Sequence, residues 1–316
     1  MEFELIDAIR MRVNIRRDDV ALGVGDDAAV LDVPAGRQLV ACADTLVAGV
    51  HFPLDTAPED LGWKSLAVNL SDLAAMGAEP AWALLALTLP EPDAFLVAAF
   101  AEGFAELARA HDVALVGGDT TQGPLSITVT AFGVVPVGGA LRRGGARAGD
   151  AVFVTGTLGD AAGALRQLQD GVAPAERLRA KLSRPEPRIA AGLALRGIAS
   201  ACIDVSDGLL ADLGHACVAS GVGAELDADA LPMSSALTAA FDRAACRALA
   251  LAGGDDYELC FTAPAARQTE IAAALAQAGC SATRIGRIVA GSGVRALDAA
   301  GNPIAPGRAG WEHFAT

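Results

Sequence analysis

Residues 58–89, PEDLGWKSLAVNLSDLAAMGAEPAWALLALTL, hold the pattern that decides the fold class. Three leucines recur at helical spacing, Pro58 fits a first turn and Gly77 follows the last turn, so the stretch predicts a helix over 58–76. The apolar run at 81–89 predicts a strand. A helix that leads directly into a strand is the repeating unit of an α/β or α+β fold.

The same alternation continues along the rest of the chain, whose 316 residues are enough for two domains. Strands are expected at 28–33, 38–43, 112–116 and 125–135, and a helix at 92–111. Further strands are expected at 151–155, 201–205, 223–226, 258–262 and 283–289. Single helices are expected at 159–170, 186–198, 207–219 and 265–278, and more than one helix around 235–252. A Gly- and Arg-rich stretch at 138–150 separates the two sets, so we expect domains over residues 1–140 and 147–316.

The charge balance limits the classes of partner. The chain has 38 Asp and Glu against 24 Lys and Arg, a net charge of −14, and no run of basic residues. We therefore expect no nucleic-acid or membrane partner. The longest uncharged run, residues 120–141, contains two prolines and several glycines and predicts a strand, not a membrane span. Scattered cysteines and the lack of a secretory signal predict a cytoplasmic protein.

Aspartates recur beside glycines where predicted strands end. They lie in GVGDDAAV, LVGGDT and LAGGDDYEL, and further aspartates lie in ACADTL, NLSDLAAMG and IDVSDGLLAD. Strand ends are where α/β folds place ligand-binding groups, and glycine lets a backbone approach a phosphate closely. Carboxylates are hard oxygen ligands for Mg²⁺, which shares its coordination shell with phosphates and water. The pattern therefore indicates an enzyme that handles phosphates with the help of magnesium.

Ordinary structural roles compete at most of these positions. Asp27 and Asp44 fit turns as well as they fit ligands, and Asp255 fits a turn after a helix C-terminus. Taken alone, Ser206 and Asp207 are better explained as an N-cap and a first-turn acid. The argument for a site rests on the whole set of aspartates.

Two aspartates are harder to explain structurally. Asp72 lies in the middle of the predicted helix, on a polar stripe with Ser65 and Asn69, where an aspartate has no capping role. The alternative for Asp72 is a solvated helix face. Asp204 lies inside an apolar strand. We favour a ligand role for Asp72, and Asp204 also lacks a simple structural explanation.

Several phosphate-binding patterns are absent. The only lysines, Lys64 and Lys181, do not follow a glycine, so no Walker A motif is possible. GVGDDA at 23–28 lacks the third glycine of a dinucleotide-binding turn, and the motifs of protein kinases and GxSxG hydrolases do not occur. Basic contacts to phosphate would have to come from a few arginines such as Arg142 and Arg143. These two arginines could equally well serve to keep the linker soluble.

Seven motifs follow one another along the chain: GVGDDAAVLD (23–32), ADTLVAGVHF (43–52), NLSDLAAMGAEPAWALLALTLP (69–90), LVGGDTTQGPLSITVTAFG (115–133), DVSDGLLADLG (204–214), GGDDYELCF (253–261) and WEHFAT (311–316). In this order they resemble the thiamine-phosphate kinase family. The superfamily of that family includes aminoimidazole ribonucleotide synthetase and selenophosphate synthetase. Selenophosphate synthetase carries a reactive Cys or selenocysteine near its N-terminus, whereas the first cysteine here is Cys42.

The resemblance implies ATP-dependent phosphorylation of thiamine monophosphate to thiamine diphosphate by direct in-line transfer. It implies an N-terminal α/β domain that forms a homodimer through its sheet, and a C-terminal α/β domain. ATP and several Mg²⁺ ions would lie in the cleft between the two domains. Two alternatives are another ATP-dependent enzyme of the superfamily, such as a cyclo-ligase that activates a carbonyl oxygen, and a non-enzymatic acidic metal-binding protein.

The resemblance also implies roles for single residues. The implied Mg²⁺ ligands are Asp27, Asp44, Asp72, Asp119, Asp204 and Asp207. Of these, Asp44, Asp72 and Asp119 are expected to form the catalytic set, and the Mg²⁺ ions that they hold would bridge the ATP phosphates. The implied nucleotide contacts are Gly118, Asp119, Arg143 and Ser206, and the implied thiamine-phosphate contacts are His51, Asp255 and Trp311.

This chain departs from the family pattern at three places. The family often has hydroxyl ligands where Cys42 and Ala43 stand, so these two residues would bind metal only through main-chain carbonyls. Asp255 replaces a common glutamate and has a shorter reach. Trp311 stands where an aromatic residue is expected, with tyrosine also used. Simpler alternatives are a packed loop residue for His51 and a C-terminal anchor for Trp311.

Overall fold

The computed structural model describes residues 2–304 and 307–313. The chain divides into two compact units. The first unit comprises residues 1–73 and 78–138, and the second comprises 74–77 and 139–316. The division falls at Gly138, where the predicted linker begins, and a four-residue piece around Met76 belongs with the second unit.

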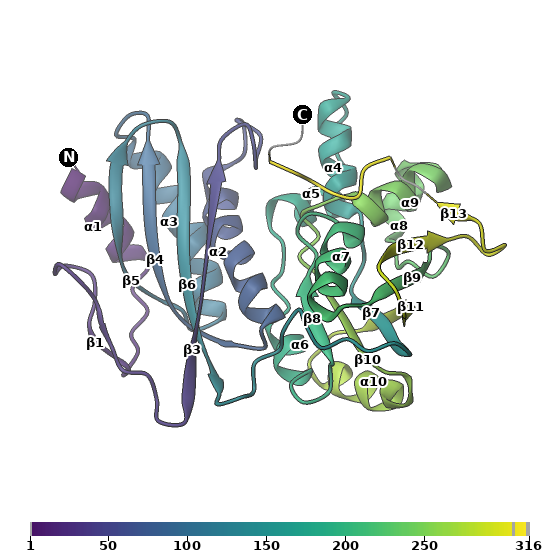
Figure 1. Ribbon diagram of the computed structural model, residues 1–316. Coiled ribbons are helices and arrows are strands. Elements are labelled where there is room, and N and C mark those ends of the chain that lie inside the picture. The colour runs from purple at the N-terminus through teal and green to yellow at the C-terminus, as the bar shows by residue number, and fades with distance from the viewer. Residues whose placement is uncertain (1, 305–306, 314–316) are drawn as a thin grey trace. The chain divides into compact units, whose positions relative to one another are not determined.

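The first unit is a four-stranded sheet covered by helices on one face (Figure 1). The strand order is β3 (Arg37–Val47), β6 (Ser126–Pro136), β4 (Glu79–Leu89) and β5 (Ala114–Gln122), with β4 and β5 parallel and the other pairs antiparallel. Helices α2 (Pro58–Ala75) and α3 (Ala94–Ala110) cover the sheet, and α1 (Glu2–Arg12) packs on α3. The short strands β1 (Val20–Leu22) and β2 (Val30–Leu31) pair with each other.

The second unit is built on a seven-stranded sheet. The strand order is β13 (Pro303–Ile304), β12 (Gly293–Leu297), β9 (Gly223–Asp227), β11 (Ala282–Val289), β7 (Asp150–Thr155), β10 (Leu259–Pro264) and β8 (Ala201–Asp204). Its helices are α4 (Asp160–Gln169), α5 (Glu176–Ser183), α6 (Ile189–Ala194), α7 (Leu209–Ser220), α8 (Ser235–Ala240), α9 (Arg243–Ala252), the 3₁₀ turn η1 (Ala265–Arg267) and α10 (Gln268–Gln277). Apolar residues of β7, β8 and α7 form much of the buried core.

The mixed α/β fold class is confirmed, and the predicted helix over 58–76 and strand at 81–89 are α2 and β4. The helices predicted around 235–252 are α8 and α9, which are separated at Asp242. The Asp242 carboxylate accepts the Ala245 N–H and begins α9. The helices α1 and α5 and the strands β1, β12 and β13 were not predicted. None of the helices in the described part of the chain is long and apolar enough to cross a membrane.

The observed lengths of β3 and β5 correct the predicted positions of two aspartates in the first unit. β3 pairs with β6 from Arg37 to Val47, and β5 pairs with β4 as far as Gln122. Asp44 and Asp119 therefore lie inside strands, and the prediction that each follows a strand end is wrong. Neighbouring strands extend the ladder through polar residues, an effect that local sequence does not reveal. Conversely, the strand predicted at 28–33 is reduced to the two residues of β2.

Two glycines let α2 and α3 approach backbone to backbone. A β-carbon at Gly62 would lie 1.9 Å from the Phe100 carbonyl oxygen, and one at Gly103 would lie 1.8 Å from the Glu59 carbonyl oxygen. No larger residue fits at either place without moving a helix. The helix spacing under the sheet therefore depends on these two positions.

We expect Gly103→Ala to destabilise the protein by about 1–3 kcal/mol, because the added methyl group must push the two helices apart. The matched control is Gly214→Ala in α7, where a β-carbon would meet nothing within 4 Å. That change should stabilise by about 0.5–1 kcal/mol, since alanine favours a helix interior over glycine. Guanidinium denaturation followed by circular dichroism measures both, and equal midpoints would contradict the close helix contact.

Candidate functional site

The sheet of the first unit separates the predicted acidic ligands onto two faces. Directly paired residues in neighbouring strands point to the same face. Asp44 pairs with the buried Val129, in a row that faces the helices. Asp119 pairs with Ala86, which is exposed on the opposite, open face. One copy of the first unit therefore does not gather Asp44 and Asp119 around one ion.

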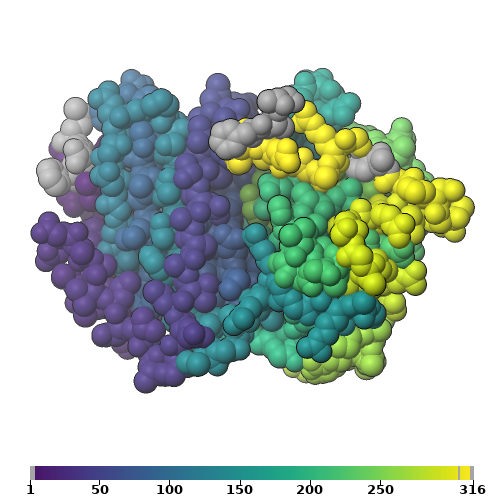
Figure 2. All heavy atoms as spheres, in the orientation of Figure 1, coloured from purple at the N-terminus to yellow at the C-terminus, as the bar shows by residue number. Residues whose placement is uncertain are grey.

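Cys42 and Ala43 also point to opposite faces, because they are neighbours in β3. The Cys42 thiol donates to the main-chain carbonyl of Asn69 in α2 at 3.3 Å. Asp44, two residues along the strand, shares the helix-facing side with Cys42. Ala43 is exposed on the open face of the sheet. Figure 2 shows the surface of the first unit from the side of this face.

The polar stripe of α2 is not a solvated helix face. Ser65 and Asn69 are almost completely buried, at 1% and 0% exposure. The Ser65 hydroxyl donates to the Gly62 carbonyl at 3.0 Å, and the Asn69 amide donates to the Ser65 carbonyl at 3.1 Å. Asp72 continues this stripe and is half-buried. The arrangement disfavours the solvated-face alternative for Asp72.

Asp27 and His51 lie in loops of the first unit. Asp27 is exposed. Its N–H donates to the Asp26 carboxylate at 2.8 Å, so the side chain of Asp26 stabilises the local turn. The His51 Nδ1 accepts the Val47 N–H at 2.9 Å, and the His51 N–H donates to the Val47 carbonyl at 3.0 Å. These bonds make His51 a fixed part of the loop after β3, with Nε2 carrying the proton of the neutral ring.

Gly118 has a structural reason to be glycine. Its φ is +152°, and a β-carbon would lie 1.8 Å from the Leu85 carbonyl oxygen. Gly118 and Asp119 border a small cavity of about 60 Å³ between α1, β4 and β5, lined mainly by apolar groups such as Ile6 and Leu115. The predicted nucleotide contacts of the first unit thus lie beside an apolar hollow.

The loop between β8 and α7 brings four predicted site residues of the second unit together. The Ser206 carbonyl accepts the Asp255 N–H at 2.8 Å, and the Asp207 carbonyl accepts the Trp311 N–H at 3.0 Å. Burial raises the pKa of the Asp207 carboxyl, and the charge of Arg143 opposes that rise. The loop therefore joins predicted nucleotide and metal contacts to predicted thiamine-phosphate contacts.

The predicted N-cap is wrong. α7 begins after Gly208, and neither Ser206 nor any other side chain at that position caps it. Asp212, in the first turn of α7, instead accepts N–H groups of the preceding loop through its carboxylate. The sequence interpretation missed Asp212, although DVSDGLLADLG contains it. An aspartate at the fourth helical position gives no local capping signal, because its partners precede it in the chain.

Several carboxylates of the second unit lie close together. Asp204 ends β8 and is only 4% exposed. Burial raises the pKa of Asp212 to about 7, and the negative charges of Asp204 and Asp207 contribute to the rise. Such mutual repulsion is relieved by a bound cation, and carboxylate oxygens are suitable ligands for Mg²⁺.

No group of three or more His, Cys, Asp or Glu within residues 2–304 and 307–313 is arranged to hold a metal by itself. This does not conflict with magnesium, which usually takes one or two carboxylates and completes its shell with phosphates and water. The chemistry of the donor set therefore fits Mg²⁺ bound together with a phosphate ligand.

Residues 255–258 have a strained backbone. Asp255 and Tyr257 have φ angles of +66° and +48°, which side-chain-bearing residues seldom adopt. The Tyr257 hydroxyl donates to the Asp255 carboxylate at 2.9 Å. α9 ends at Ala252 with Gly253 in an extended conformation, so Asp255 follows a helix C-terminus as expected.

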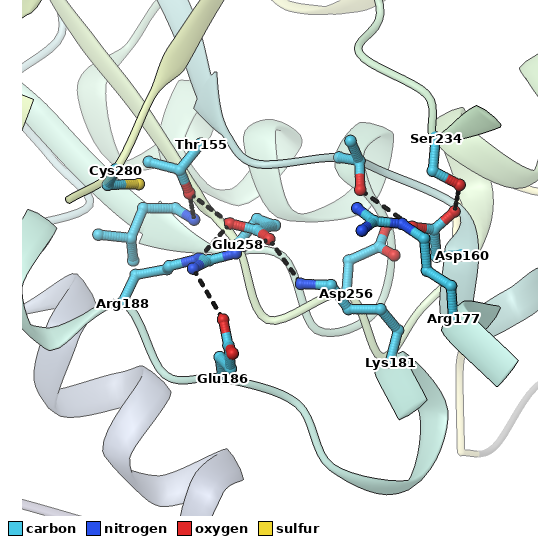
Figure 3. Close-up of polar contacts among 12 residues, drawn as sticks. Thr155, Asp160, Arg177, Lys181, Glu186, Arg188, Ser234, Asp256, Glu258 and Cys280 are labelled. Carbon is cyan, nitrogen blue, oxygen red and sulfur yellow. Dashed lines mark hydrogen bonds and ion pairs between the residues drawn. The ribbon is translucent and has the colours of Figure 1, made fainter. Parts of the chain in front are cut away.

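Buried carboxylates hold this strained segment in place (Figure 3). Both oxygens of Asp256 lie 2.9 Å from the Gly159 N–H. Glu258, which is 0% exposed, accepts two bonds of 2.6 Å from the Arg188 guanidinium, with Lys181 at 3.2 Å and the Thr155 hydroxyl at 2.7 Å. The polar partners compensate the burial of Glu258, and they fix the position of the neighbouring Tyr257 and Asp255.

We expect Arg188→Met to destabilise the protein by about 3–5 kcal/mol, because it leaves the buried Glu258 without its main cation. The matched control is Arg295→Met, which removes a pair with Glu225 on the exposed surface. That loss should be much smaller, since water screens the pair. Guanidinium denaturation measures both variants, and equal losses would contradict a supporting role for the buried pair.

Known proteins similar to this chain cover its whole length. Residues 25–135 match the AIR synthase related protein, N-terminal domain, and residues 147–298 match the corresponding C-terminal domain. A thiamine-monophosphate kinase of Salmonella typhimurium is 48% identical over 320 residues, which cover 100% of this chain and 98% of that protein.

Solved structures agree with the sequence comparison. A crystal structure of thiamine-monophosphate kinase from Stenotrophomonas maltophilia has a TM-score of 0.88 and 55% identity, with 93% of this chain and 96% of that chain covered. The structure of AaThiL complexed with AMPPCP and TMP has a TM-score of 0.79 and 34% identity, with 99% and 97% covered. The chain therefore belongs to the AIR synthase related family and, within it, to the thiamine-monophosphate kinases.

Proposed function

We infer that this chain is a kinase that transfers the γ-phosphoryl group of ATP to thiamine monophosphate and so forms thiamine diphosphate. The observation that carries the inference is the 48% identity to a thiamine-monophosphate kinase over the whole chain. A relative with 34% identity has been crystallised with the ATP analogue AMPPCP and TMP, which supports both substrates. A cyclo-ligase or a non-enzymatic metal-binding protein would not account for these two findings together.

The proposed substrate contacts divide by role. We assign the nucleotide to Gly118, Asp119, Arg143 and Ser206, and thiamine monophosphate to His51, Asp255 and Trp311. The bonds from Asp255 and Trp311 to the Ser206–Asp207 loop support this assignment, because they join donor-side and acceptor-side groups within the second unit.

We propose magnesium as the metal, held by Asp27, Asp44, Asp72, Asp119, Asp204 and Asp207. When bound, Mg²⁺ would neutralise phosphate charge that these carboxylates would otherwise repel. β3 is an edge strand in which alternate residues point their main-chain carbonyls away from β6, so one of the neighbours Cys42 and Ala43 has a carbonyl that is compatible with a ligand role. The Cys42 thiol donates to Asn69, so it is not assigned to the metal.

The proposed mechanism needs no side-chain base. The attacking group is an oxygen of a phosphate monoester, which is already anionic near neutral pH. The protein has to bring two anionic groups into line, and phosphoryl transfer depends mainly on such positioning and on charge neutralisation. Asp255, Trp311 and His51 would orient the acceptor, while Ser206 and Arg143 would orient the donor.

We also propose a homodimer formed through the open face of the first unit's sheet. Leu39, Ala41 and Ala43 of β3 are exposed on this face, which none of the first unit's helices covers (Figure 1). A small apolar sheet face is suited to burial against a second copy. Asp119 lies on the same face and would then be close to the subunit boundary.

The decisive experiment is incubation of the pure protein with Mg-ATP and thiamine monophosphate. We expect thiamine diphosphate and ADP in equal amounts, with no product after chelation of the metal. In the same assay, Asp72→Asn should fold normally and lose roughly 10²–10³ in kcat, the usual cost of removing a transition-state charge contact.

Asp60→Asn, in the first turn of the same helix, is the control and should keep most activity. ATP turnover without thiamine diphosphate would contradict the proposed reaction. Near-normal activity of Asp72→Asn at saturating magnesium would contradict the role of Asp72.

For Trp311→Ala, we expect KM for thiamine monophosphate to rise roughly tenfold, the change that corresponds to an aromatic contact of about 1.4 kcal/mol. KM for ATP should change much less. Phe95→Ala, which truncates an aromatic side chain that is 83% exposed, is the control and should alter neither constant. An equal rise in both KM values for Trp311→Ala would count against a substrate role.

A further inference from the structure

We propose that Asp212 is a positioning residue for the transfer reaction: its buried carboxylate fixes the 206–208 loop, which carries the nucleotide-side groups and anchors the acceptor-side groups. The inference rests on the proposed kinase function. It concerns a residue that does not itself touch either substrate in this assignment. Three observations support it.

The first observation is the set of bonds on the N–H side of the loop. One oxygen of Asp212, Oδ2, accepts the N–H groups of Ser206, Asp207 and Gly208, each at 3.0 Å. Asp212 is 3% exposed, so water does not compete for these donors. Three consecutive N–H groups that converge on one carboxylate oxygen hold the backbone in a single conformation, because all three bonds constrain the same short segment.

The second observation is that these three N–H groups are not available to bind a ligand, because Asp212 already accepts them. Backbone N–H groups of a loop that leads into a helix can bind phosphate. Here Asp212 occupies the N–H groups of the three residues that precede α7, so the loop has no main-chain donors left at these positions for the ATP phosphates. The contribution of the loop to the nucleotide must therefore come from the side chains of Ser206 and Asp207, whose directions the backbone sets.

The third observation is the set of bonds on the carbonyl side. The Ser206 carbonyl accepts the Asp255 N–H at 2.8 Å, and the Asp207 carbonyl accepts the Trp311 N–H at 3.0 Å. The first turn of α7 also binds the C-terminal segment, since the Ala211 N–H donates to the Ala309 carbonyl at 3.1 Å. The loop thus has Asp212 on one side and both proposed acceptor contacts of this unit on the other.

Gly208 gives the loop little freedom to adapt. Its φ is +136°, and a β-carbon there would lie 2.9 Å from the Ala252 carbonyl carbon. A loop confined in this way transmits a shift of its N–H side to its carbonyl side. Loss of the Asp212 acceptor should therefore displace Ser206 and Asp207 together with Asp255 and Trp311.

The experiment compares Asp212→Ala, Asp212→Asn and Asp212→Glu in the thiamine diphosphate assay. Alanine removes the acceptor, and glutamate keeps the charge but moves it by one methylene. For both we expect kcat/KM to fall roughly 10²-fold for ATP and for thiamine monophosphate alike, a loss typical of small misplacements. Asparagine keeps an oxygen acceptor at the same place, so it should remain within about tenfold of wild type.

The matched control is Asp242→Ala, which removes another carboxylate that accepts a backbone N–H at a helix start in the same unit. It should lower the denaturation midpoint and leave kcat/KM for both substrates unchanged. A merely structural role for Asp212 would give the same result for Asp212→Ala, and that result would overturn the proposal.

The asparagine and glutamate variants separate geometry from charge, and they decide the question even if the alanine variant does not fold. Activity retained by glutamate and lost by asparagine would overturn the proposal in favour of a charge role. A fall for thiamine monophosphate alone would also overturn it, because the loop would then serve only one substrate. Absence of product with the wild-type protein would be a failure of the proposed function itself, which the variants do not affect.

Discussion

The second unit depends on one constraint: several of its acidic groups are buried, and each buried group must be compensated. A buried carboxylate without partners is costly, so every such group has to be matched by donors or by a cation. Glu258 has Arg188 and Lys181, Asp256 has the Gly159 N–H, and Asp212 has three backbone N–H groups. Each compensation fixes a stretch of backbone next to a predicted substrate contact.

This constraint joins the stability of the unit to its chemistry. Asp255 and Tyr257 alternate with Asp256 and Glu258, so the buried pair holds the strained pair in position. Strain of this kind persists only where the surroundings over-determine the backbone. The proposed metal-binding carboxylates would repel a triphosphate, which is why the proposed chemistry requires magnesium and why, with the metal, a net charge of −14 is compatible with ATP.

In the first unit the organising constraint is the alternation of side chains along the strands. The pairing of β3 with β6 places Asp44 toward the helices, while the pairing of β5 with β4 places Asp119 on the open face. Glycines at the α2–α3 contact bring the helices close together, and the buried stripe of Ser65 and Asn69 leads to Asp72. The proposed catalytic carboxylates therefore come from different parts of the first unit: the two faces of its sheet and the helix α2.

The sequence by itself determined the α/β class, the helix over 58–76 and the order of the Asp-Gly motifs, because periodicity and short motifs are local properties of the chain. It did not reveal the true ends of β3 and β5, the bonds from Asp212 to the 206–208 loop, or the pairing of Glu258 with Arg188. Only the tertiary structure decided these, since each depends on groups that are distant in the chain or on a ladder formed by neighbouring strands. A carboxylate shows its charge in the sequence, but its partners and the face it occupies are set by packing.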